Sequence, residues 1–480
     1  MSYRKEFYEL LSQSGLSLDQ HATPFTLLFV YPGVGVGKVF DDLAGCTKQL
    51  CLLADTQQRA HGLGIQIAAL SSVDTLTEAL TNTYFPIGVI NQDNIPEDLK
   101  VIKNGRSFFT RAAYLKHPTG EVERWLEPDG IRMVDSGFHK VEQAYLHYVH
   151  QVTHDELPIA LLKDKSVTIL PNGADSRGVL HLALNKDYIL KRQSILDSER
   201  EASYMIAMND VADPLFPHIH SHKSISHEHW VVMDKLLKPE KLELKLVLTR
   251  LSKFYCATRN FTSVDLSYHL AERFYVIAES EGFSQTLSMH DFDKYSLIRL
   301  PVFIKGRKTY CLQEAIHEIA RITPHLKAPF VCAIHGDVHI PNLLHNDQGQ
   351  LRLIDPRLTW DDKFSVDGVF DPTYDFATLL HSYMMDALDT SFVEEMPTGE
   401  LVIPDVFFEV GSQLESAFLE CLSGLLPELA DDTGFITKLR IFCANATFGW
   451  LKYPAAVKTR AHLLSYIAMT IFWLDRAIKY

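Results

Sequence analysis

The residue types best suited to chemistry gather in one stretch of the C-terminal half. It reads HGDVHIPN over residues 335–342 and is followed, after one predicted hairpin, by LIDPR over residues 353–357. Phosphoryl transfer needs a carboxylate that orients the attacking hydroxyl and accepts its proton, together with oxygen ligands for the Mg²⁺ that bridges the phosphates. We therefore predict Asp337 as the catalytic base and Asn342 and Asp355 as the Mg²⁺ ligands.

A nucleotide also needs a cation for its phosphates. Lys191 ends a predicted apolar strand, which is where that role requires a lysine. On the helix predicted to follow, Glu201 or else Glu199 would pair with this lysine. We favour Glu201, because the apolar residues around it indicate which face of the helix packs inward.

Two further features complete the predicted nucleotide-binding set. The loop over residues 170–178, which contains Gly173 and Ser176, would fold over the phosphates with its backbone N–H groups. Taken alone, the loop fits an ordinary hairpin as well, and its position before Lys191 favours the phosphate-binding interpretation. Met233, at the end of a later apolar strand, is the last member of the set.

A second reactive site is predicted near the N-terminus, where Cys46 and Cys51 form a close pair in GCTKQLC over residues 45–51. The first cysteine opens a predicted helix, where backbone N–H groups and the helix dipole stabilise a thiolate and favour its attack on a peroxide. Arg111, on an adjacent predicted strand, would add a second positive charge. We predict these three residues as a catalytic thiol site.

A bond between the two cysteines would have a structural cost. In an intact helix the Cα atoms of residues five apart lie roughly 8.7 Å from each other, whereas disulfides rarely exceed about 6.8 Å. Oxidation would therefore require the first helical turn to unwind. Three roles are left open for the pair: a peroxidase or thiol reductase, a redox-sensing disulfide, and a purely structural module.

The elements around the lysine and the aspartates predict a small β lobe and a helical lobe. Strands are predicted at 166–170, 179–184, 188–192 and 230–233, and a helix at 197–208. After residue 234, everything except residues 331–354 is predicted to be helical. This order is the outline of a two-lobed kinase.

The N-terminal elements predict a separate α/β layer fold. Strands are predicted at 26–31 and 65–70, helices at 46–61 and 73–82, and a hairpin-like pair around Arg111 and Gly120. A polar helical segment follows at 139–157. We place the domain boundary at Pro158.

The motifs HGDVHIPN, LIDPR and, over residues 371–382, DPTYDFATLLHS together resemble the aminoglycoside phosphotransferase and choline kinase superfamily, which shares the protein-kinase fold. The D-x-x-x-x-N spacing is that of a kinase catalytic loop. The resemblance implies that His335 and His339 support the loop and that Asp375 fixes it from the helix below. It also implies ATP or another nucleoside triphosphate and Mg²⁺ as cofactors, and a small-molecule hydroxyl as acceptor.

The thiol site is similar to that of peroxiredoxins of the bacterioferritin-comigratory type, which have a thioredoxin-like fold and a second cysteine five residues after the first. The resemblance covers roughly Thr23 to Trp125. It implies a peroxide and a thiol reductant as partners. The chain departs from the pattern with Leu43 where a threonine is usual, with Ala54 where an arginine is common, and with a longer loop before Cys46.

Two other clusters have open interpretations. Five histidines precede an apolar strand, and because their spacing matches no recognised metal site we expect an edge strand and loop: His218, His220, His222, His227 and His229. Four acids would be solvated or would contact a cationic acceptor: Asp361, Asp362, Asp367 and Asp371. Arg357 is equally compatible with an anionic or carbohydrate acceptor.

Composition limits the remaining choices. The chain has 480 residues, 46% of them apolar, which is enough for at least two domains. Its net charge is −14 and no basic run stands out, so nucleic acid is not an expected partner. The first thirty residues lack a secretory signal and the apolar stretch 463–474 is too short for a membrane span, so we expect a soluble cytoplasmic protein without a membrane partner.

We therefore predict an α/β and α+β protein with three segments: a peroxiredoxin-like thioredoxin-fold domain at 1–157, a kinase small lobe at 158–234 and a large helical lobe at 235–480. The predicted function is an ATP-dependent phosphotransferase acting on a hydroxyl of a small metabolite or sugar, fused to a redoxin-like thiol domain. Two alternatives are a thiol peroxidase regulated by a nucleotide-binding kinase-like part, and a pathway scaffold in which neither half turns over alone.

Overall fold

The computed structural model forms two compact units. The first unit contains Met1–Ala202 and His218–Lys235, and the second contains Ser203–Pro217 and Leu236–Tyr480. The described residues are 3–16, 18, 24–56, 60, 62–73, 85–153, 167–171, 176–184, 186–211, 213–225, 228–360, 364–365, 368–388 and 400–479. The boundary predicted at Pro158 lies outside them, and the first unit joins residues of the predicted redoxin-like and small-lobe segments.

The first sheet of the first unit has the strand order β3-β2-β1-β6-β7. Its strands are β1 (Phe25–Tyr31), β2 (Ile65–Ser71), β3 (Ile87–Val89), β6 (Ala112–Lys116) and β7 (Val122–Leu126). β1 is parallel to β2 and antiparallel to β6, which in turn is antiparallel to β7. The parallel pair needs a crossover, and α2 (Cys46–Asp55) supplies it. This topology confirms the predicted thioredoxin-like fold.

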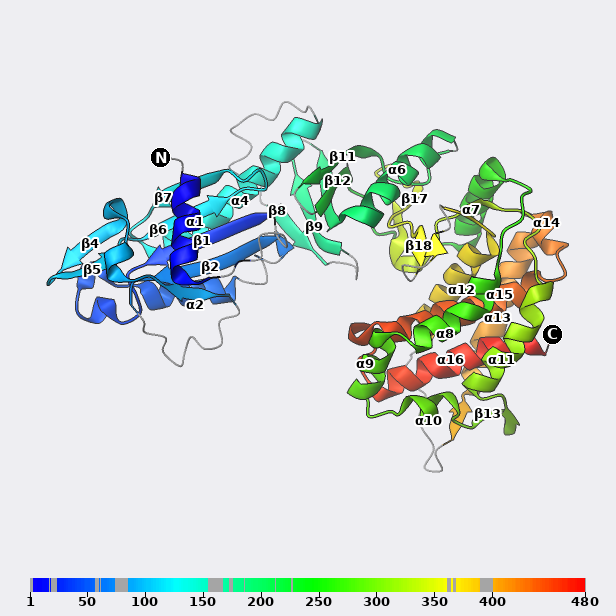
Figure 1. The fold of residues 1–480 in the computed structure, drawn as a ribbon. Coiled ribbons are helices and arrows are strands. Elements are labelled where there is room, and N and C mark those ends of the chain that lie inside the picture. Colours follow the sequence, from blue (N-terminus) through cyan, green and yellow to red (C-terminus); the bar gives the residue numbers. More distant parts are fainter. Residues whose placement is uncertain are drawn as a thin grey trace. The chain divides into compact units, whose positions relative to one another are not determined.

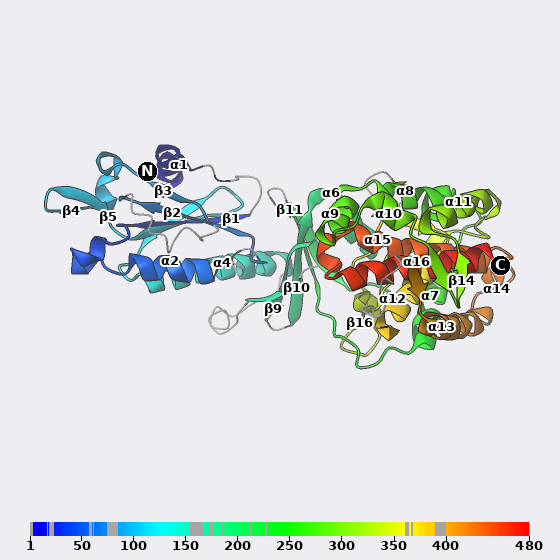
Figure 2. The same cartoon turned by 90° about the horizontal axis from the view of Figure 1, so that it is seen from below.

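Helices cover both faces of this sheet. Figure 2 shows α1 (Tyr3–Ser14) on one face and α2 with α4 (Gly130–Thr153) on the other. The residues of β1 are all buried, because its side chains alternate between two separate cores. A small hairpin of β4 (Lys100–Lys103) and β5 (Arg106–Phe109) is also present.

The second sheet of the first unit is antiparallel, with the order β11-β12-β10-β9-β8. Its strands are β8 (Val167–Leu170), β9 (Ser176–Ala183), β10 (Asp187–Ser194), β11 (Ile219–Ile225) and β12 (Glu228–Asp234). The four strands predicted for the small lobe are all present. Of the five histidines, His220 and His222 lie on β11, an edge strand as expected, and His218 directly precedes it. His229 instead lies on the interior strand β12, and His227 lies outside the described residues.

The helix α6 (Ile195–Val211) follows β10, and the division between the units falls within it. In the first unit the two sheets share one hydrophobic core, and Figure 1 shows α4 reaching the second sheet. The core residues of the second sheet are Val167, Leu180, Leu182, Tyr188, Leu190, Trp230 and Val232. The predicted redoxin-like segment and the predicted small lobe therefore fold as one body.

The second unit is mainly helical. Its longer helices are α7 (Leu244–Thr258), α9 (Glu281–Met289), α11 (Leu312–Ile322), α12 (Thr373–Ala387), α13 (Asp405–Ser423), α15 (Phe435–Gly449) and α16 (Arg460–Ile478). The apolar stretch noted in the sequence lies within α16, which packs against α15 and is buried over most of its length. Among the described residues, no helix combines the length and the apolarity that crossing a membrane requires.

One prediction for this unit is wrong. Outside residues 331–354, a three-stranded sheet forms from β13 (Val302–Ile304), β14 (Arg307–Thr309) and β21 (Leu401–Ile403). The tight turn between the first two strands places Lys305 at φ 49° and Gly306 at φ 74°. Strands of three residues have no readable period, and β21 pairs with a segment far away in the sequence, so local pattern does not reveal them.

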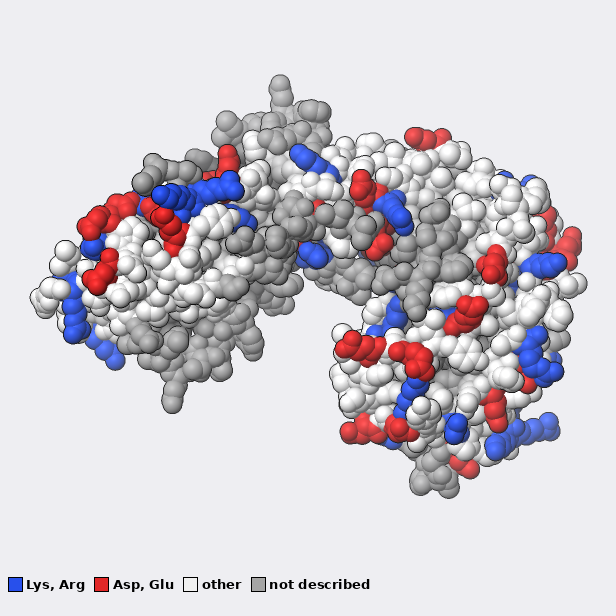
Figure 3. Space-filling view, in the orientation of Figure 1, with Lys and Arg blue, Asp and Glu red and all other residues white. Residues whose placement is uncertain are grey.

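Charged side chains are mixed on the described surface. On the face drawn in Figure 3, Lys and Arg are interspersed with Asp and Glu in each unit. On that face the charges of neither unit gather into one large patch of a single sign.

Candidate active site

The loop that contains Asp337 is held by one buried carboxylate. Asp375, in the first turn of α12, accepts hydrogen bonds from the backbone N–H groups of His335 and Gly336, each at 2.7 Å. The hydroxyl of Tyr255 on α7 donates to the same carboxylate at 2.8 Å. Gly336 has a φ of 80°, a conformation that favours glycine. The geometry agrees with the loop-fixing role that the resemblance implies for Asp375.

Burial strongly affects the acid–base behaviour of this support. Asp375 is fully buried, and the loss of solvation raises its pKa to about 6 against the pull of its hydrogen-bond donors. Burial lowers the pKa of His335 to about 4, so this imidazole is neutral at pH 7. Its Nδ1 accepts the N–H of Asp337 at 3.2 Å, and its Nε2–H donates to the Ile354 carbonyl at 2.8 Å.

Asp337 itself is fixed through its backbone and not through its carboxylate. Its carbonyl oxygen accepts hydrogen bonds from Asn342 Nδ2 at 3.1 Å and from His339 Nδ1 at 3.0 Å. The carboxylate is 38% exposed, and its Oδ1 lies 3.7 Å from His339 Nδ1. This arrangement presents an accessible carboxylate on a rigid loop, which is the geometry a general base needs.

The two predicted metal ligands lie on neighbouring segments. Asn342 ends the short helix η8 (Ile340–Asn342), and its carbonyl accepts the N–H of Ile354 at 3.2 Å. Because its side-chain nitrogen is engaged with Asp337, its Oδ1 is the atom suited to a cation. Asp355 follows at φ 58°, a left-handed conformation that costs roughly 1 kcal/mol or more outside glycine and that clusters at functional sites.

These ligands fit Mg²⁺ in type, because carboxylate and amide oxygens suit it. Among the described residues, no group of three or more His, Cys, Asp or Glu is placed to hold a metal ion. A Mg²⁺ bound here would thus take few ligands from the chain and the rest from phosphates and water, as is usual at kinase sites.

The predicted phosphate-binding lysine lies in the first unit. Lys191 on β10 is 7% exposed, and its Nζ lies 3.6 Å from Glu201 Oε2 on α6, whereas Glu199 is exposed. Met233 on β12 is paired with Ile189, two residues before the lysine, so Met233 and Lys191 share one face of the sheet. Gly173 and the side chain of Ser176 lie outside the described residues.

The thiol site has the predicted neighbours. Cys46 begins α2 and is buried, and Arg111, which directly precedes β6, donates from Nη2 to its Sγ at 3.4 Å. The guanidinium also donates to three backbone carbonyls, at Leu43 (3.2 Å), Ala44 and Pro128 (2.7 Å). Burial, with the Cys46 charge as a second cause, raises the pKa of the nearby Tyr31 well above its usual range.

Cys51 lies on the same helix as Cys46 but is exposed, and both thiols are free. With α2 intact from Cys46 to Asp55, the two sulfurs occupy different environments. A bond between them would require the helix to open, as the sequence indicates.

Other predicted contacts take different forms. Asp371, one of the four acids, is neither solvated nor available to an acceptor, because it is fully buried and bonded to Lys438 Nζ at 2.6 Å. The other three acids lie outside the residues whose side chains the structure describes. Of the histidines, His220 bonds Asp234 at 2.7 Å, and His222 bonds His229 at 3.1 Å.

Sequence reasoning missed several residues that shape the loop. Tyr255 supports Asp375, the Tyr204 hydroxyl donates to the Ile334 carbonyl at 2.6 Å, and the Ser382 hydroxyl accepts the N–H of Ile340 at 2.8 Å. The two tyrosines lie on helices far from the loop in the sequence, where they look like ordinary apolar-face residues. Ser382 closes the DPTYDFATLLHS motif and could have been noticed there.

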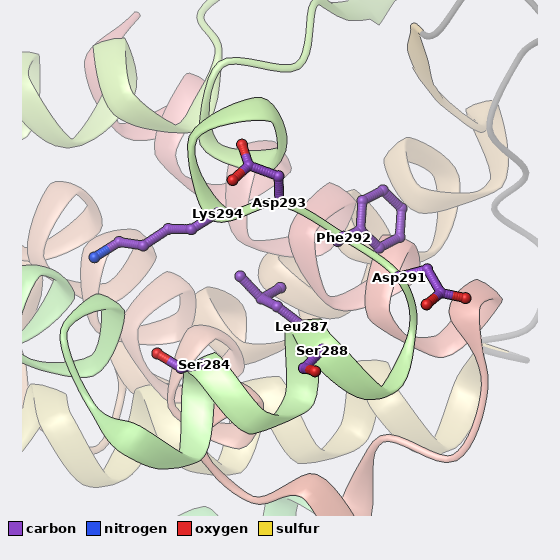
Figure 4. A pocket seen from close by; sticks show the side chains of 7 residues that line it. All are labelled: Ser284, Leu287, Ser288, Asp291, Phe292, Asp293 and Lys294. Carbon is purple, nitrogen blue, oxygen red and sulfur yellow. The ribbon is translucent and has the colours of Figure 1, made fainter.

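Two open cavities of the second unit lie away from the loop. Figure 4 shows one of about 500 Å³, lined by α9 and the segment after it, with Ser284, Ser288 and Asp291 among its residues. The other, of about 770 Å³, is lined by residues such as Lys308, His317 and Lys479. Neither includes a predicted catalytic residue.

No family model matches the sequence, and no curated protein matches it. Some solved structures are similar in part. A protein described as a fructosamine-3-kinase from Haemophilus somnus is 10% identical, covers 68% of this chain and 94% of its own, and has a TM-score of 0.38. A Plasmodium vivax ethanolamine kinase is 12% identical, covers 72% and 88%, and has a TM-score of 0.40.

The N-terminal part has a separate similarity. Peroxiredoxin Q from Xanthomonas campestris is 18% identical, covers 27% of this chain and 84% of its own, and has a TM-score of 0.22.

Proposed function

We propose that this chain is a kinase that transfers a phosphoryl group from ATP, or another nucleoside triphosphate, to a hydroxyl of a small metabolite or sugar. The observation that carries the proposal is the arrangement of the loop over residues 335–342. Its backbone, its first histidine and its asparagine are held by hydrogen bonds, whereas the Asp337 carboxylate is 38% exposed. A rigid loop with one accessible carboxylate suits the base of a phosphotransferase.

In this proposal each residue has one task. Asp337 orients the acceptor hydroxyl and takes its proton as the oxygen attacks the γ-phosphorus, whose bond to the bridging oxygen breaks so that the nucleoside diphosphate leaves. Asn342 and Asp355 would hold Mg²⁺, which when bound neutralises charge on the phosphates. Lys191, oriented by Glu201, would bind the phosphates.

The side chain of Arg357 supports an acceptor with anionic or carbohydrate character. Its backbone N–H donates to the His335 carbonyl at 2.7 Å, and its Nη2 donates to the Tyr453 hydroxyl at 3.0 Å. A guanidinium beside the loop is the type of group that binds carboxylate, phosphate or sugar oxygens.

The test is ATP turnover by the full chain with Mg²⁺ and pooled alcohols, sugars and aminoglycosides. Asp337→Ala should lower acceptor-dependent turnover by about 10²- to 10⁴-fold, as expected for loss of a general base. Asp347→Ala is the matched control, because this acid lies exposed in the hairpin just beyond the loop. ATP binding without transfer to any acceptor would instead favour a nucleotide-regulated peroxidase or a scaffold.

The contact between Arg111 and Cys46 Sγ favours a second, thiol activity. We propose that Cys46 reacts with a peroxide, that Cys51 resolves the product, and that a thiol reductant restores both. Peroxide consumption with a dithiol reductant should be lost in Cys46→Ser and reduced in Cys51→Ser. Equal peroxide consumption by the wild type and both variants would mean that the cysteine pair has only a structural role.

A further inference from the structure

Strand β10 has two faces with different tasks. Tyr188, Leu190 and Arg192 point into the core that the second sheet shares with the redoxin-like part of the first unit. Lys191 lies between the last two in sequence and points to the other face, where it meets Glu201. Since side chains of a strand alternate, the position of the lysine depends on how firmly its neighbours are held on the opposite face.

Arg192 is held on that opposite face by groups from both parts of the unit. Its side chain is 1% exposed, and Nη1 lies 3.5 Å from Glu228 Oε2 on β12. Nη2 donates to the Arg177 carbonyl at 2.8 Å and to the Gly62 carbonyl at 3.3 Å. Gly62 belongs to the segment that leads from α2 into β2, so the redoxin-like part contacts the guanidinium directly.

The backbone of this segment approaches the guanidinium closely at a residue whose conformation favours glycine. A Cβ on Gly64 would lie 1.3 Å from Arg192 Nη1, and the φ of this residue is 63°. On the redoxin-like side this contact is made by backbone atoms, and on the other side it is made by the Arg192 guanidinium.

An aromatic stack anchors the neighbouring strand at the same level. Trp230 on β12 is the direct partner of Arg192 in the strand register. The Tyr145 ring of α4 stacks on this indole with centroids 5.0 Å apart and planes 21° apart, and the Tyr148 ring meets it edge-on at 5.1 Å. The Tyr145 hydroxyl also donates to the Leu63 carbonyl.

We propose that the redoxin-like part positions the phosphate-binding lysine, with Arg192 and Tyr145 as positioning residues that fix β10 and β12 one residue away from Lys191. This inference rests on the proposed kinase function for its consequence, but its structural content concerns the first unit alone. A one-residue slip of β10 would turn Lys191 into the core and Arg192 out of it. The buried guanidinium and the stack oppose that slip.

The buried ion pair between Arg192 and Glu228 makes the position of β10 sensitive to small changes. Burial raises the pKa of Glu228, so the carboxylate needs the nearby guanidinium to remain charged. Any loosening of the contact between Gly62 and Arg192 would disturb this pair and the strand that carries the lysine. In this proposal the redoxin-like part packs against the sheet that contains β10 and β12 and keeps Lys191 on the opposite face.

The first experiment measures Lys191 directly and does not need ATP. A water-soluble succinimidyl ester acylates accessible lysines, and mass spectrometry of the full-length protein reports the rate at Lys191, whose side chain is 8% exposed. Tyr145→Leu should speed acylation at Lys191 by about tenfold, because a looser strand opens more often. Tyr145→Phe keeps the ring and should retain the wild-type rate.

Val30→Ala is the matched control. Val30 lies in the same unit but in the other core of the first sheet, packed with α1. It should lower the melting temperature and leave acylation of Lys191 unchanged. Equal acylation in Tyr145→Leu and wild type, or an equal rise in Val30→Ala, would overturn the inference.

The second experiment separates this inference from the proposed function. With Mg·ATP as the probe, Tyr145→Leu should raise KM for ATP by about tenfold or more with little change in kcat, as expected for a misplaced binding group. Failure of the wild-type protein to bind Mg·ATP would overturn the kinase proposal, and the acylation rates would still decide whether the redoxin-like part positions Lys191. A normal KM for Tyr145→Leu beside a raised KM for Lys191→Ala would overturn the positioning role.

Discussion

The proposed catalytic loop and the proposed thiol site each depend on one buried charged side chain, and the two charges differ in sign. At the loop, Asp375 accepts two backbone N–H groups and one tyrosine hydroxyl. At the thiol site, Arg111 donates to three backbone carbonyls and to Cys46 Sγ. In both places a buried charge orders the backbone next to the reactive group.

The difference lies in what happens near neutral pH. Burial raises the pKa of Asp375 to about 6, so this support can lose its charge under mild acid. At the thiol site, by contrast, the oxygen acceptors of Arg111 are backbone carbonyls, which do not titrate. We infer that the order of the catalytic loop depends on pH, whereas the scaffold of the thiol site does not.

Removing the buried acid should have the largest effect. Asp375→Ala leaves two buried N–H groups and the Tyr255 hydroxyl without their acceptor, and we expect a loss of about 3 kcal/mol or more in the free energy of unfolding. The loop would also move, so phosphotransfer per folded molecule should fall by about 100-fold or more. Denaturant unfolding and initial rates measure the two effects.

Glu415→Ala is the matched control for this variant. Glu415 is another buried acid of the second unit, and it binds Arg440 at 2.7 Å as well as Arg476. Its loss should destabilise the unit without changing phosphotransfer per folded molecule. An equal loss of rate in both variants would show that Asp375 acts only through stability.

Replacing Asp375 by asparagine isolates the effect of its protonation on the free energy of unfolding. Between about pH 4 and pH 6 folded Asp375 binds a proton that the unfolded chain has lost, so its contribution to stability falls as pH rises, by about 3 kcal/mol in total. Burial lowers the pKa of His335 to about 4 and of His381 to about 3, and these groups have the opposite sign. Their contributions to stability are lost as pH falls.

Asp375→Asn removes the first contribution and keeps the other two. From pH 6 to pH 4, the free energy of unfolding should therefore drop by about 3 kcal/mol more in the variant than in the wild type. Urea unfolding at a series of pH values measures the difference. Parallel curves for the two proteins would mean that Asp375 has an ordinary pKa, and the contrast with Arg111 would fail.

The sequence suggested candidate reactive residues, but it did not reveal several of the groups that support them. Asp337, Asn342 and Asp355 belong to short local motifs, because one loop and one strand end must carry them together. Tyr255 is 120 positions from Asp375, and no local pattern links the two. The Lys191 and Glu201 pair was readable because it joins a strand to the next helix.

The fold likewise contains contacts between distant segments that local sequence patterns do not predict. Most strands of the two sheets of the first unit could be read from period and breakers, since they are several residues long, whereas the three-residue strand β3 was not predicted. The shared core could not, because Arg192 reads in the sequence as one more charge at the end of a strand. Its side chain is buried against Gly62 and Gly64, and this contact between segments distant in the sequence forms only in the tertiary structure.

At the thiol site, the guanidinium should matter through its contact with sulfur. In a Cys51→Ser background, Arg111→Met should slow alkylation of Cys46 by iodoacetamide by about tenfold, since one charge-assisted contact to the thiolate is lost. Arg106→Met is the control, because Arg106 is an exposed arginine on β5. An unchanged rate in Arg111→Met would show that this arginine only supports the loop before α2.

The smallest expected effect separates the donors of Asp375 from one another. Tyr255→Phe removes one hydrogen bond of 2.8 Å and leaves the two backbone N–H groups in place. Because this bond favours the charged carboxylate, its loss should raise the pKa of Asp375 further, by about one unit, and shift the acid limb of the pH–rate profile upward by the same amount. The rate above pH 8 should change by less than about threefold.

Tyr204→Phe is the control, since that hydroxyl donates to the Ile334 carbonyl and not to Asp375. An acid limb that coincides in all three proteins would place its origin elsewhere, in Asp337 or a nucleotide phosphate, and the pH dependence of the loop would then not distinguish it from the thiol site.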